Sequence, residues 1–286
     1  MVEHQEYAVR STRGRIIDAL PWYVMIDESR VGRASYLMDL ARELVVRDMK
    51  LRYKRSILGI GWSLLNPLLQ FLVFYGVFRW IIPVNVPDFA VFLLIGILAW
   101  SWFQSSLHFG CAVITDNASL IRQPGFPAAI LPVIAVGTNL VNFVLALPVL
   151  AIALLVTGHS VTAAIVVLPF VIVIQFLLTL SAVYLLAVLQ VPFRDTQYLV
   201  GVLLLLGLYV SPVFYSVQSV PVDWQRWFNL NPLAHILEAY RMVLIQGRYP
   251  DMWPLLWIAA ISIMVLAATH RVFVRSSHWF IEEIGS

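Results

Sequence analysis

Six long apolar stretches determine what this chain can fold into. Each is near or above the roughly 18–20 residues that an α-helix needs to cross a bilayer. They run over residues 57–82, 89–110, 128–157, 161–190, 197–216 and 252–273. Hydrophobic residues make up 60% of the 286 residues and charged residues only 12%, whereas soluble domains carry about 25% charge. The sequence therefore predicts an all-α integral membrane protein with six transmembrane helices.

The linkers between these stretches predict the topology. Two of them, residues 83–88 and 158–160, contain no Lys or Arg, whereas two others carry Arg122 and Arg194. Because basic linkers are retained on the cytoplasmic side, we expect the first pair outside and the second pair inside. Both termini are then cytoplasmic, and the chain is a multi-pass protein of the cytoplasmic, or inner, membrane. The first span itself is expected to direct insertion, with no cleavable signal peptide before it.

Residues 217–250 interrupt this alternation. Their apolar part, residues 233–246, is too short to cross, and counting it as a span would move Arg275 to the outside. We therefore expect a re-entrant helical hairpin between the fifth and sixth spans, on the outer side. Irregular backbone is tolerated at membrane depth where protein or water covers it. Glu238 and Arg241 within it are spaced so that they can pair on a helix.

The segment before the first span carries most of the positive charge. Eleven of the 19 Lys and Arg residues lie within residues 1–60. Residues 34–56 predict an amphipathic helix at the membrane surface, because leucines gather on one side and charged residues on the other. Its basic residues are expected near lipid phosphates; they are Arg47, Lys50, Arg52, Lys54 and Arg55. The alternatives are an ordinary soluble helix and, less favoured by the pattern, nucleic-acid binding.

Motifs for catalysis, nucleotide binding and metal binding are missing from the sequence. No GxxxxGK[ST], GxSxG, HExxH or CxxC occurs, and the single cysteine, Cys111, excludes an internal disulfide. The spans hold almost no Asp or Glu, whereas ion-coupled carriers usually keep an acidic residue at membrane depth. We expect no catalytic residue, metal site or cofactor in this chain, and no coupling to a proton or sodium gradient.

Five segments occur in the order and spacing of one transporter family. They are RDMKLRYKRSILGIGWSLLNP (47–67), DNASLIRQPGFP (116–127), FRD (193–195), SPVFY (211–215) and NPLAHILEAYR (231–241). Over residues 40–280 the chain resembles the polysaccharide-exporting ABC-2 type permeases, which export O-antigen, group 2 capsule and teichoic acid. The resemblance implies one pore formed by two copies of the chain. It also implies two separate ATP-binding cassette subunits, which hold ATP and Mg, and a lipid-linked polysaccharide as substrate.

The same resemblance implies a docking surface for the ATPase. A stiff helix end around residues 116–127, on the first inner loop, would fit a groove of the ATPase and transmit its movement, helped by residues 34–55. Asp116 or Asn117 is expected to cap that helix. The residues implied in coupling are Asp116, Asn117, Leu120, Ile121, Arg122, Phe126, Arg194 and Asp195. A plain intracellular loop is the alternative.

This interpretation divides the chain into four parts. A cytoplasmic arm, residues 1–33, precedes the interfacial helix, residues 34–56. The permease domain covers residues 57–273 and includes the hairpin, and residues 274–286 form a cytoplasmic tail.

Aromatic residues are candidates for the substrate channel. Their faces stack on the CH faces of sugars, and neighbouring hydroxyl and amide groups bond to the sugar hydroxyls. The candidates lie late in span one, in span two and late in span five; they are Tyr75, Phe78, Trp100, Trp102, Phe103, Tyr209, Phe214 and Tyr215. Trp100 and Phe103 share a helix face, and Trp102 points about 200° from Trp100, so at most one of these sets can line a pore. An aromatic belt at the membrane surface is the alternative role.

Two other functions compete with polysaccharide export. An ABC exporter of a small amphiphile, such as a drug or a lipid, would share the topology but lack a wide aromatic channel. A polytopic membrane transferase would need Asp, Glu or His clustered at one membrane depth, and the sequence shows no such cluster.

Overall fold

The computed structural model describes residues 30–53, 59, 61–82, 84 and 86–283. The chain divides into two parts, Met1–Arg42 and Glu43–Ser286. In the described portion of the shorter part, residues 30–42 are helical and form the first half of α2 (Arg30–Tyr53). The contacts below all lie within the longer part.

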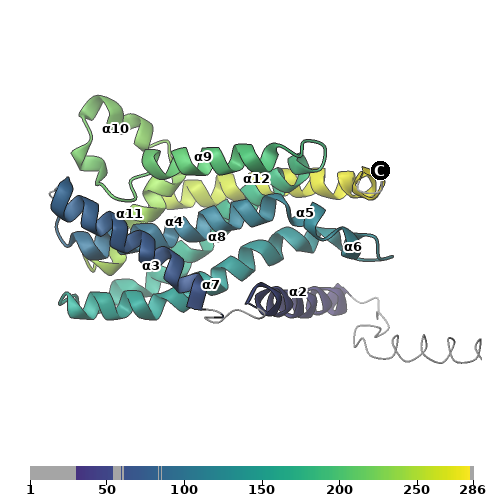
Figure 1. The fold of residues 1–286 in the computed structure, drawn as a ribbon, viewed down its shortest axis with the longest axis horizontal. Coiled ribbons are helices and arrows are strands. Elements are labelled where there is room, and N and C mark those ends of the chain that lie inside the picture. The colour runs from purple at the N-terminus through teal and green to yellow at the C-terminus, as the bar shows by residue number, and fades with distance from the viewer. Residues whose placement is uncertain (1–29, 54–58, 60, 83, 85, 284–286) are drawn as a thin grey trace, which may run out of the picture. The chain divides into compact units, whose positions relative to one another are not determined.

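All regular structure in the described residues is helical, which confirms the predicted all-α class. After α2 the helices are α3 (Gly61–Gly76), the π-helix η1 (Val77–Ile81), α4 (Phe89–Cys111), α5 (Val113–Asp116), α6 (Ala118–Ile121), η2 (Ala128–Ile130), α7 (Leu131–Val156), η3 (Ala163–Val167), α8 (Leu168–Gln190), α9 (Thr196–Val210), η4 (Val217–Ser219), α10 (Val222–Phe228), α11 (Pro232–Leu244) and α12 (Met252–Glu283) (Figure 1).

Five helical segments are long and apolar enough to cross a membrane, so the chain is a multi-pass membrane protein. They are Gly61–Ile81, Phe89–Cys111, Ala128–Val156, Ala163–Gln190 and Met252–Ser276. The fifth predicted span, residues 197–216, corresponds to α9, which is apolar but has only 15 residues. At 1.5 Å per residue α9 is about 22 Å long, shorter than the hydrocarbon core of about 30 Å. The described helices therefore support five spans by length, and a sixth span stays a prediction.

α4 is the central helix of the bundle. Every residue from Val91 to Trp100 is buried, and this stretch is apolar on all sides, as expected for a core helix in a membrane protein. It packs against α3, α7, α8, α9 and α11. Glycine allows one of these close contacts, because a Cβ at Gly110 would lie 2.4 Å from a methyl carbon of Val183 on α8.

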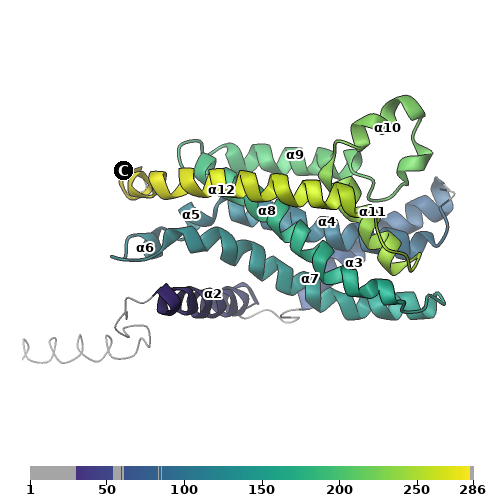
Figure 2. The ribbon, with the colours of Figure 1, turned by 180° about the vertical axis from the view of Figure 1, so that it is seen from behind.

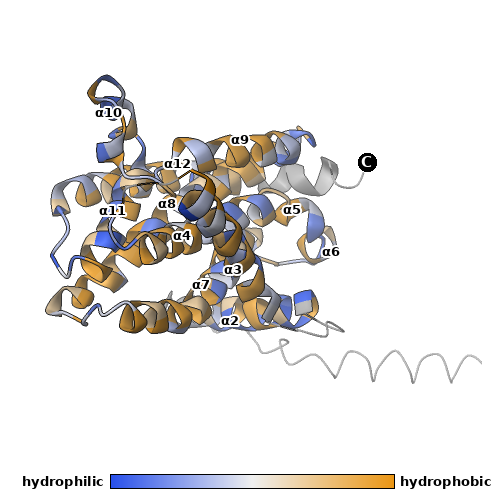
Figure 3. Ribbon diagram, turned by 60° about the vertical axis from the view of Figure 1, so that its left-hand side comes forward, coloured by the Kyte–Doolittle hydropathy of each residue, from blue (hydrophilic) through white to orange (hydrophobic). Residues whose placement is uncertain are grey.

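α8 and α12 pack side by side, and in the view from behind they lie in front of α4 (Figure 2). A buried amide ties α8 to α4, because Gln175 Nε2 donates to the Ala99 carbonyl oxygen over 2.8 Å. In an apolar medium such a bond holds two helices where hydrophobic driving force is weak. The long helices are hydrophobic over most of their surface, and hydrophilic residues gather near α6 and α10 (Figure 3).

The linkers predicted on the same side of the membrane meet in space. His159 Nε2 lies 3.2 Å from Asp88 Oδ2, which joins the two linkers expected outside. At the other end of the helices, Cys111 Sγ donates to Gln190 Oε1 over 3.5 Å, beside the two linkers expected inside. The pairing of linkers thus agrees with the predicted alternation, while the membrane side of each pair stays a prediction.

The hairpin region is partly packed into the bundle. Helix α11 packs against α4, α8 and α12, and Asn231 caps its start by accepting a hydrogen bond from the Leu233 N–H over 3.0 Å. Helix α10 projects from the end of the bundle and has exposed Trp224 and Trp227. Re-entry of this region into the membrane stays a prediction.

The helix before the first span begins earlier than predicted. α2 starts at Arg30 instead of residue 34, and residues 54–56 lie outside the described residues, with Lys54 and Arg55 among them. Leu44 and Met49 are buried, whereas Lys50, Leu51 and Arg52 are exposed. The burial of α2 is therefore uneven around its axis, but its amphipathic role at a membrane surface stays a prediction.

Candidate translocation site and coupling surface

Phe214 is the centre of a group of aromatic rings near one end of the bundle. Its ring centroid lies 5.1 Å from that of Phe74, 5.5 Å from Phe78, 5.7 Å from Tyr209 and 5.9 Å from Tyr215. These are normal separations for stacked and edge-to-face pairs. Three further rings extend the group; they are Tyr75, Phe89 and Phe228. Phe89 contacts both Tyr75 and Phe78, and Phe228 contacts Tyr215. We name the set the outer aromatic cluster, after the membrane side that the sequence predicts for it; it comprises Phe74, Tyr75, Phe78, Phe89, Tyr209, Phe214, Tyr215 and Phe228.

Five of the eight predicted channel residues belong to this cluster. Tyr75 and Phe78 come from α3 and η1, Tyr209 from α9, and Phe214 and Tyr215 from the segment that follows α9. Residues more than 130 positions apart are thus brought into contact. Phe74, Phe89 and Phe228 were not predicted, although the four-residue spacing of Phe74 and Phe78 on a helical face could have indicated the first of them.

The turn after α9 sets the direction of Phe214. α9 ends at Val210, and a tight turn follows in which the Val213 N–H donates to the Ser211 carbonyl oxygen over 2.7 Å. Tyr215 Oη donates to the Tyr209 carbonyl oxygen over 2.8 Å, which ties the turn to the last turn of α9. The turn therefore directs the Phe214 ring toward α3, where it is 4% exposed.

Local structure in α3 and η1 presents the other side of the cluster. The chain changes from α to π geometry at Val77, and the Ile82 N–H donates to the Val77 carbonyl oxygen over 2.9 Å. Such π segments are rare and are often found at functional sites. The cluster is only partly closed, since Phe78 and Tyr215 are half-buried and Tyr209 is 56% exposed.

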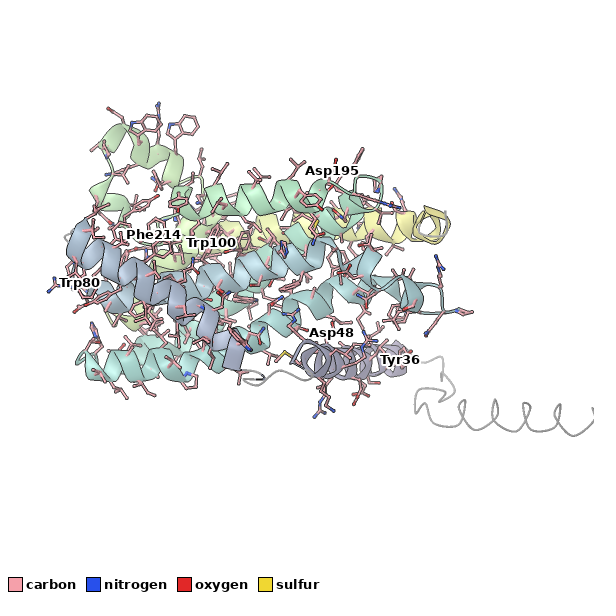
Figure 4. The ribbon with its side chains drawn as sticks, viewed as in Figure 1. Tyr36, Asp48, Trp80, Trp100, Asp195 and Phe214 are labelled. Atoms are coloured by element: carbon pink, nitrogen blue, oxygen red, sulfur yellow. The ribbon has the colours of Figure 1, made fainter. Side chains whose placement is uncertain are left out.

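The two tryptophans of α4 face different neighbours, as their spacing predicted. Trp100 lies beside Phe103, at 5.7 Å between centroids, and its indole packs against Gly207 of α9. Trp102 stacks on Phe143 of α7 at 5.1 Å. Trp100 therefore shares the α9 side of the bundle with Tyr209, and Phe214 and Trp100 both lie toward the same end of the molecule (Figure 4). Which set lines a pore stays a prediction, because a pore between two copies involves a second chain.

The loop between α4 and α7, which the sequence predicts on the inner side and which we call the first inner loop, consists of two single helical turns, α5 and α6, instead of one longer helix. Asn117 stands at the start of α6, but its side chain makes no cap bond there; Nδ2 donates to the Val113 carbonyl oxygen over 2.9 Å. The expected capping of a coupling helix by Asp116 or Asn117 is therefore wrong for α6. The amide instead joins α6 back to α5, which stiffens the loop.

One face of this loop is anchored and the other is exposed. Ile121 is 5% exposed, Leu120 and Phe126 are half-buried, and Asp116 and Arg122 are exposed. Desolvation by the chain beside it raises the pKa of the Asp116 carboxyl above its usual value. The loop thus has a short exposed edge, and its opposite side is packed against the protein. Such an edge suits a docking element, although its docking role stays a prediction.

Gln190 organises the loop between α8 and α9, which the sequence predicts on the inner side and which we call the second inner loop. The role of Gln190 was not predicted from the sequence. Its Nε2 donates to the Arg194 carbonyl oxygen over 3.1 Å, and its Oε1 accepts from the Gln197 N–H over 2.9 Å. The same oxygen accepts from Cys111 at the end of α4. Arg194 and Asp195 are exposed beside it, with Asp195 at the start of α9 (Figure 4). The signal in the sequence that could have indicated this role was a single glutamine at the end of a long apolar run.

Arg52 joins the end of α2 to the helical bundle. Its guanidinium carbon lies 4.1 Å from the centre of the Phe109 ring, and Nη1 donates to Asn139 Oδ1 over 3.3 Å. Arg47 pairs with the adjacent Asp48 at 3.1 Å. Part of the basic segment therefore contacts protein, and contact with lipid phosphates stays a prediction for the exposed Lys50.

Residues 40–245 match the ABC-2 type transporter family, and the chain belongs to it. Among named relatives, the O-antigen export system permease protein RfbA of Myxococcus xanthus is 37% identical over 243 residues, which are 84% of this chain and 94% of that protein. The protein of the same name from Klebsiella pneumoniae is 30% identical over 213 residues, 74% of this chain and 82% of its own. The polysialic acid transport protein KpsM of Escherichia coli is 22% identical over 226 residues, 78% and 88% of the two chains.

Proposed function

We propose that this chain is the membrane-spanning subunit of an ATP-driven exporter that moves a lipid-linked polysaccharide across the cytoplasmic membrane. The observation that carries the proposal is the 37% identity to an O-antigen export permease over 94% of that protein's length. Similarity to a polysialic acid transport protein extends the class of substrate to capsule-type polymers. O-antigen, capsule and teichoic acid type glycans are therefore the substrates to be tested.

The outer aromatic cluster supports a sugar substrate. A long polymer must be held at many places without being trapped at any. Aromatic faces bind the apolar faces of sugars weakly, and Tyr209 and Tyr215 add hydroxyl groups at the edge of the cluster. A purely aliphatic lining would leave sugar hydroxyls unsatisfied at about 1–3 kcal/mol each. The cluster avoids that cost and adds no fixed charge.

Two copies of the chain and two ATP-binding cassette subunits would form the working transporter. The sequence contains no phosphate-binding loop, so ATP and Mg would be held by the partner chains. The exposed edge of α5 and α6, together with Arg194 and Asp195, would contact those subunits. ATP hydrolysis then moves the helices through this surface, and the permease chain performs no chemistry of its own.

Deletion of the gene tests the proposed function directly. In the deletion strain, we expect the completed glycan to accumulate on the cytoplasmic side and to disappear from the cell surface. Antibody labelling of intact and permeabilised cells measures the two pools, and the wild-type gene must restore the surface pool. Normal surface glycan in the deletion strain would contradict the proposal. Altered drug or lipid export with normal glycan would favour the small-amphiphile exporter.

We further propose six spans with both termini cytoplasmic, α9 being the short fifth span and α10 and α11 a re-entrant hairpin on the outer side. Single cysteines test this arrangement, and the native Cys111 is fully buried, so it adds little background. We expect an impermeant thiol reagent to label S160C from outside but not R122C or R275C. Permeabilised cells supply the labelling control. Labelling of position 275 from outside would mean that residues 217–250 cross the membrane completely.

A further inference from the structure

Arg241 of α11 is a buried cation that forms no ion pair with a carboxylate of the described residues. It is 3% exposed, and no other Lys, Arg, Asp or Glu among the described residues is buried to this degree. The sequence predicted a pair with Glu238, but no ion pair within 4.0 Å is found for Arg241 in the described part of the chain. A charge in such surroundings is costly and is expected to have a specific role.

The guanidinium instead contacts an aromatic ring and a backbone carbonyl. Its central carbon lies 3.4 Å from the centre of the Phe92 ring on α4, and Nη2 donates to the Val213 carbonyl oxygen over 2.9 Å. A planar guanidinium can stack on a ring and donate within its own plane at the same time, which an ammonium cannot do as well. Nε of Arg241 has no hydrogen-bond partner in the described residues, so these two contacts hold the side chain.

The backbone of α4 lies directly against this contact at Gly96. A Cβ at Gly96 would lie 2.5 Å from the Val213 carbonyl oxygen and 3.0 Å from Arg241 Nη2. Only a residue without a side chain leaves room for both groups. The start of α11 holds the same turn at a second point, because Asn231 Nδ2 donates to Ser211 Oγ over 3.0 Å.

We propose that Arg241 is a positioning residue for translocation, which holds Phe214 at the centre of the outer aromatic cluster through the carbonyl group of Val213. Phe214 directly follows that carbonyl, and its ring touches rings from α3, η1 and α9. The importance of this placement for transport rests on the proposed function. Loss of the Arg241 contact releases the turn, and the cluster loses the ring that joins its parts.

A fluorine label on Phe214 reports this placement. 4-Fluorophenylalanine is incorporated at position 214 of the full chain, and its ¹⁹F spectrum is recorded for the purified dimer in lipid nanodiscs. In R241M we expect a changed chemical shift, because the neighbouring rings no longer surround the label. R248M removes a charge from the exposed Arg248 just beyond α11 and should leave the shift unchanged. Export by R241M should fall about tenfold, as for loss of one hydrogen bond from a charged donor.

Two further variants separate positioning from general folding. G96A acts on the same carbonyl from the opposite side and should give the same spectral change with Arg241 intact. R241K keeps the charge and should restore part of the export. The proposal is overturned if the fluorine shift is unchanged in both R241M and G96A, or if it changes only together with loss of dimer and of thermal stability. A wild-type chain that exports no glycan would refute the proposed function alone, since the spectra are recorded without substrate.

Discussion

Replacement of Leu120 by aspartate is expected to abolish glycan export while the permease still inserts and dimerises. Leu120 is half-buried on α6, on the loop proposed to dock into the ATPase, and the neighbouring Ile121 anchors this loop from inside. An unpaired charge moved into an apolar groove costs several kcal/mol, and about 3 kcal/mol weakens an association roughly a hundredfold. The loop keeps its own anchor, so the defect should lie in docking and not in folding.

Co-purification of the ATPase, ATP hydrolysis in proteoliposomes and surface glycan measure this effect. V161D provides the matched control, because Val161 is 73% exposed and lies in the linker at the other end of the helices. The control should bind the ATPase and stimulate hydrolysis as the wild type does. An L120D complex that assembles and exports normally would show that this loop is not the coupling element.

Removal of three half-exposed rings from the outer aromatic cluster is expected to stop polymer transport without unfolding the chain. The change is F78L, Y209L and Y215L, which keeps apolar bulk and removes aromatic faces. Each lost stacking contact weakens sugar binding by about 0.5–1.5 kcal/mol, so export should fall by about tenfold or more in the triple variant. Surface glycan at matched protein level measures the result, and thermal stability of the purified dimer serves as the folding control.

Trp102 supplies the contrasting variant. It is 3% exposed and stacked on Phe143, so W102A leaves a cavity inside one chain and should destabilise it by about 3–5 kcal/mol. We expect W102A to lose protein and export together, whereas the triple variant loses export alone. Normal export by the triple variant would contradict sugar stacking at this cluster.

The spans themselves were predictable from the sequence because they depend on local chemistry. An apolar run of 20 residues must form a helix in lipid, since no other conformation satisfies its backbone. Five of the six predicted spans have helices long enough to cross. The length of α9 was not predictable, because its chain leaves the helix at Ser211 to form a turn that is held by Asn231 and Arg241, 20 and 28 residues further on.

The candidate site was likewise predictable only in part. Helical spacing alone placed Trp100 and Phe103 on one face and Trp102 on another, and the structure agrees. Spacing could not say that α9 covers the first face and α7 the second. It likewise suggested Glu238 as the partner of Arg241, because residues three or four positions apart on a helix are the contacts that a sequence reveals.

The composition and the order of apolar segments were enough to predict that this protein lies in a bilayer, and the sequence contains no nucleotide-binding loop. Contacts in the folded chain then brought SPVFY and NPLAHILEAYR together, gathered rings of α3, η1 and α9 around Phe214, and made Gln190 the link between the two inner loops. The physical reason is that periodicity defines the face a residue occupies. The neighbour that packs on that face depends on the close approach of helices, which glycines such as Gly96 and Gly110 allow.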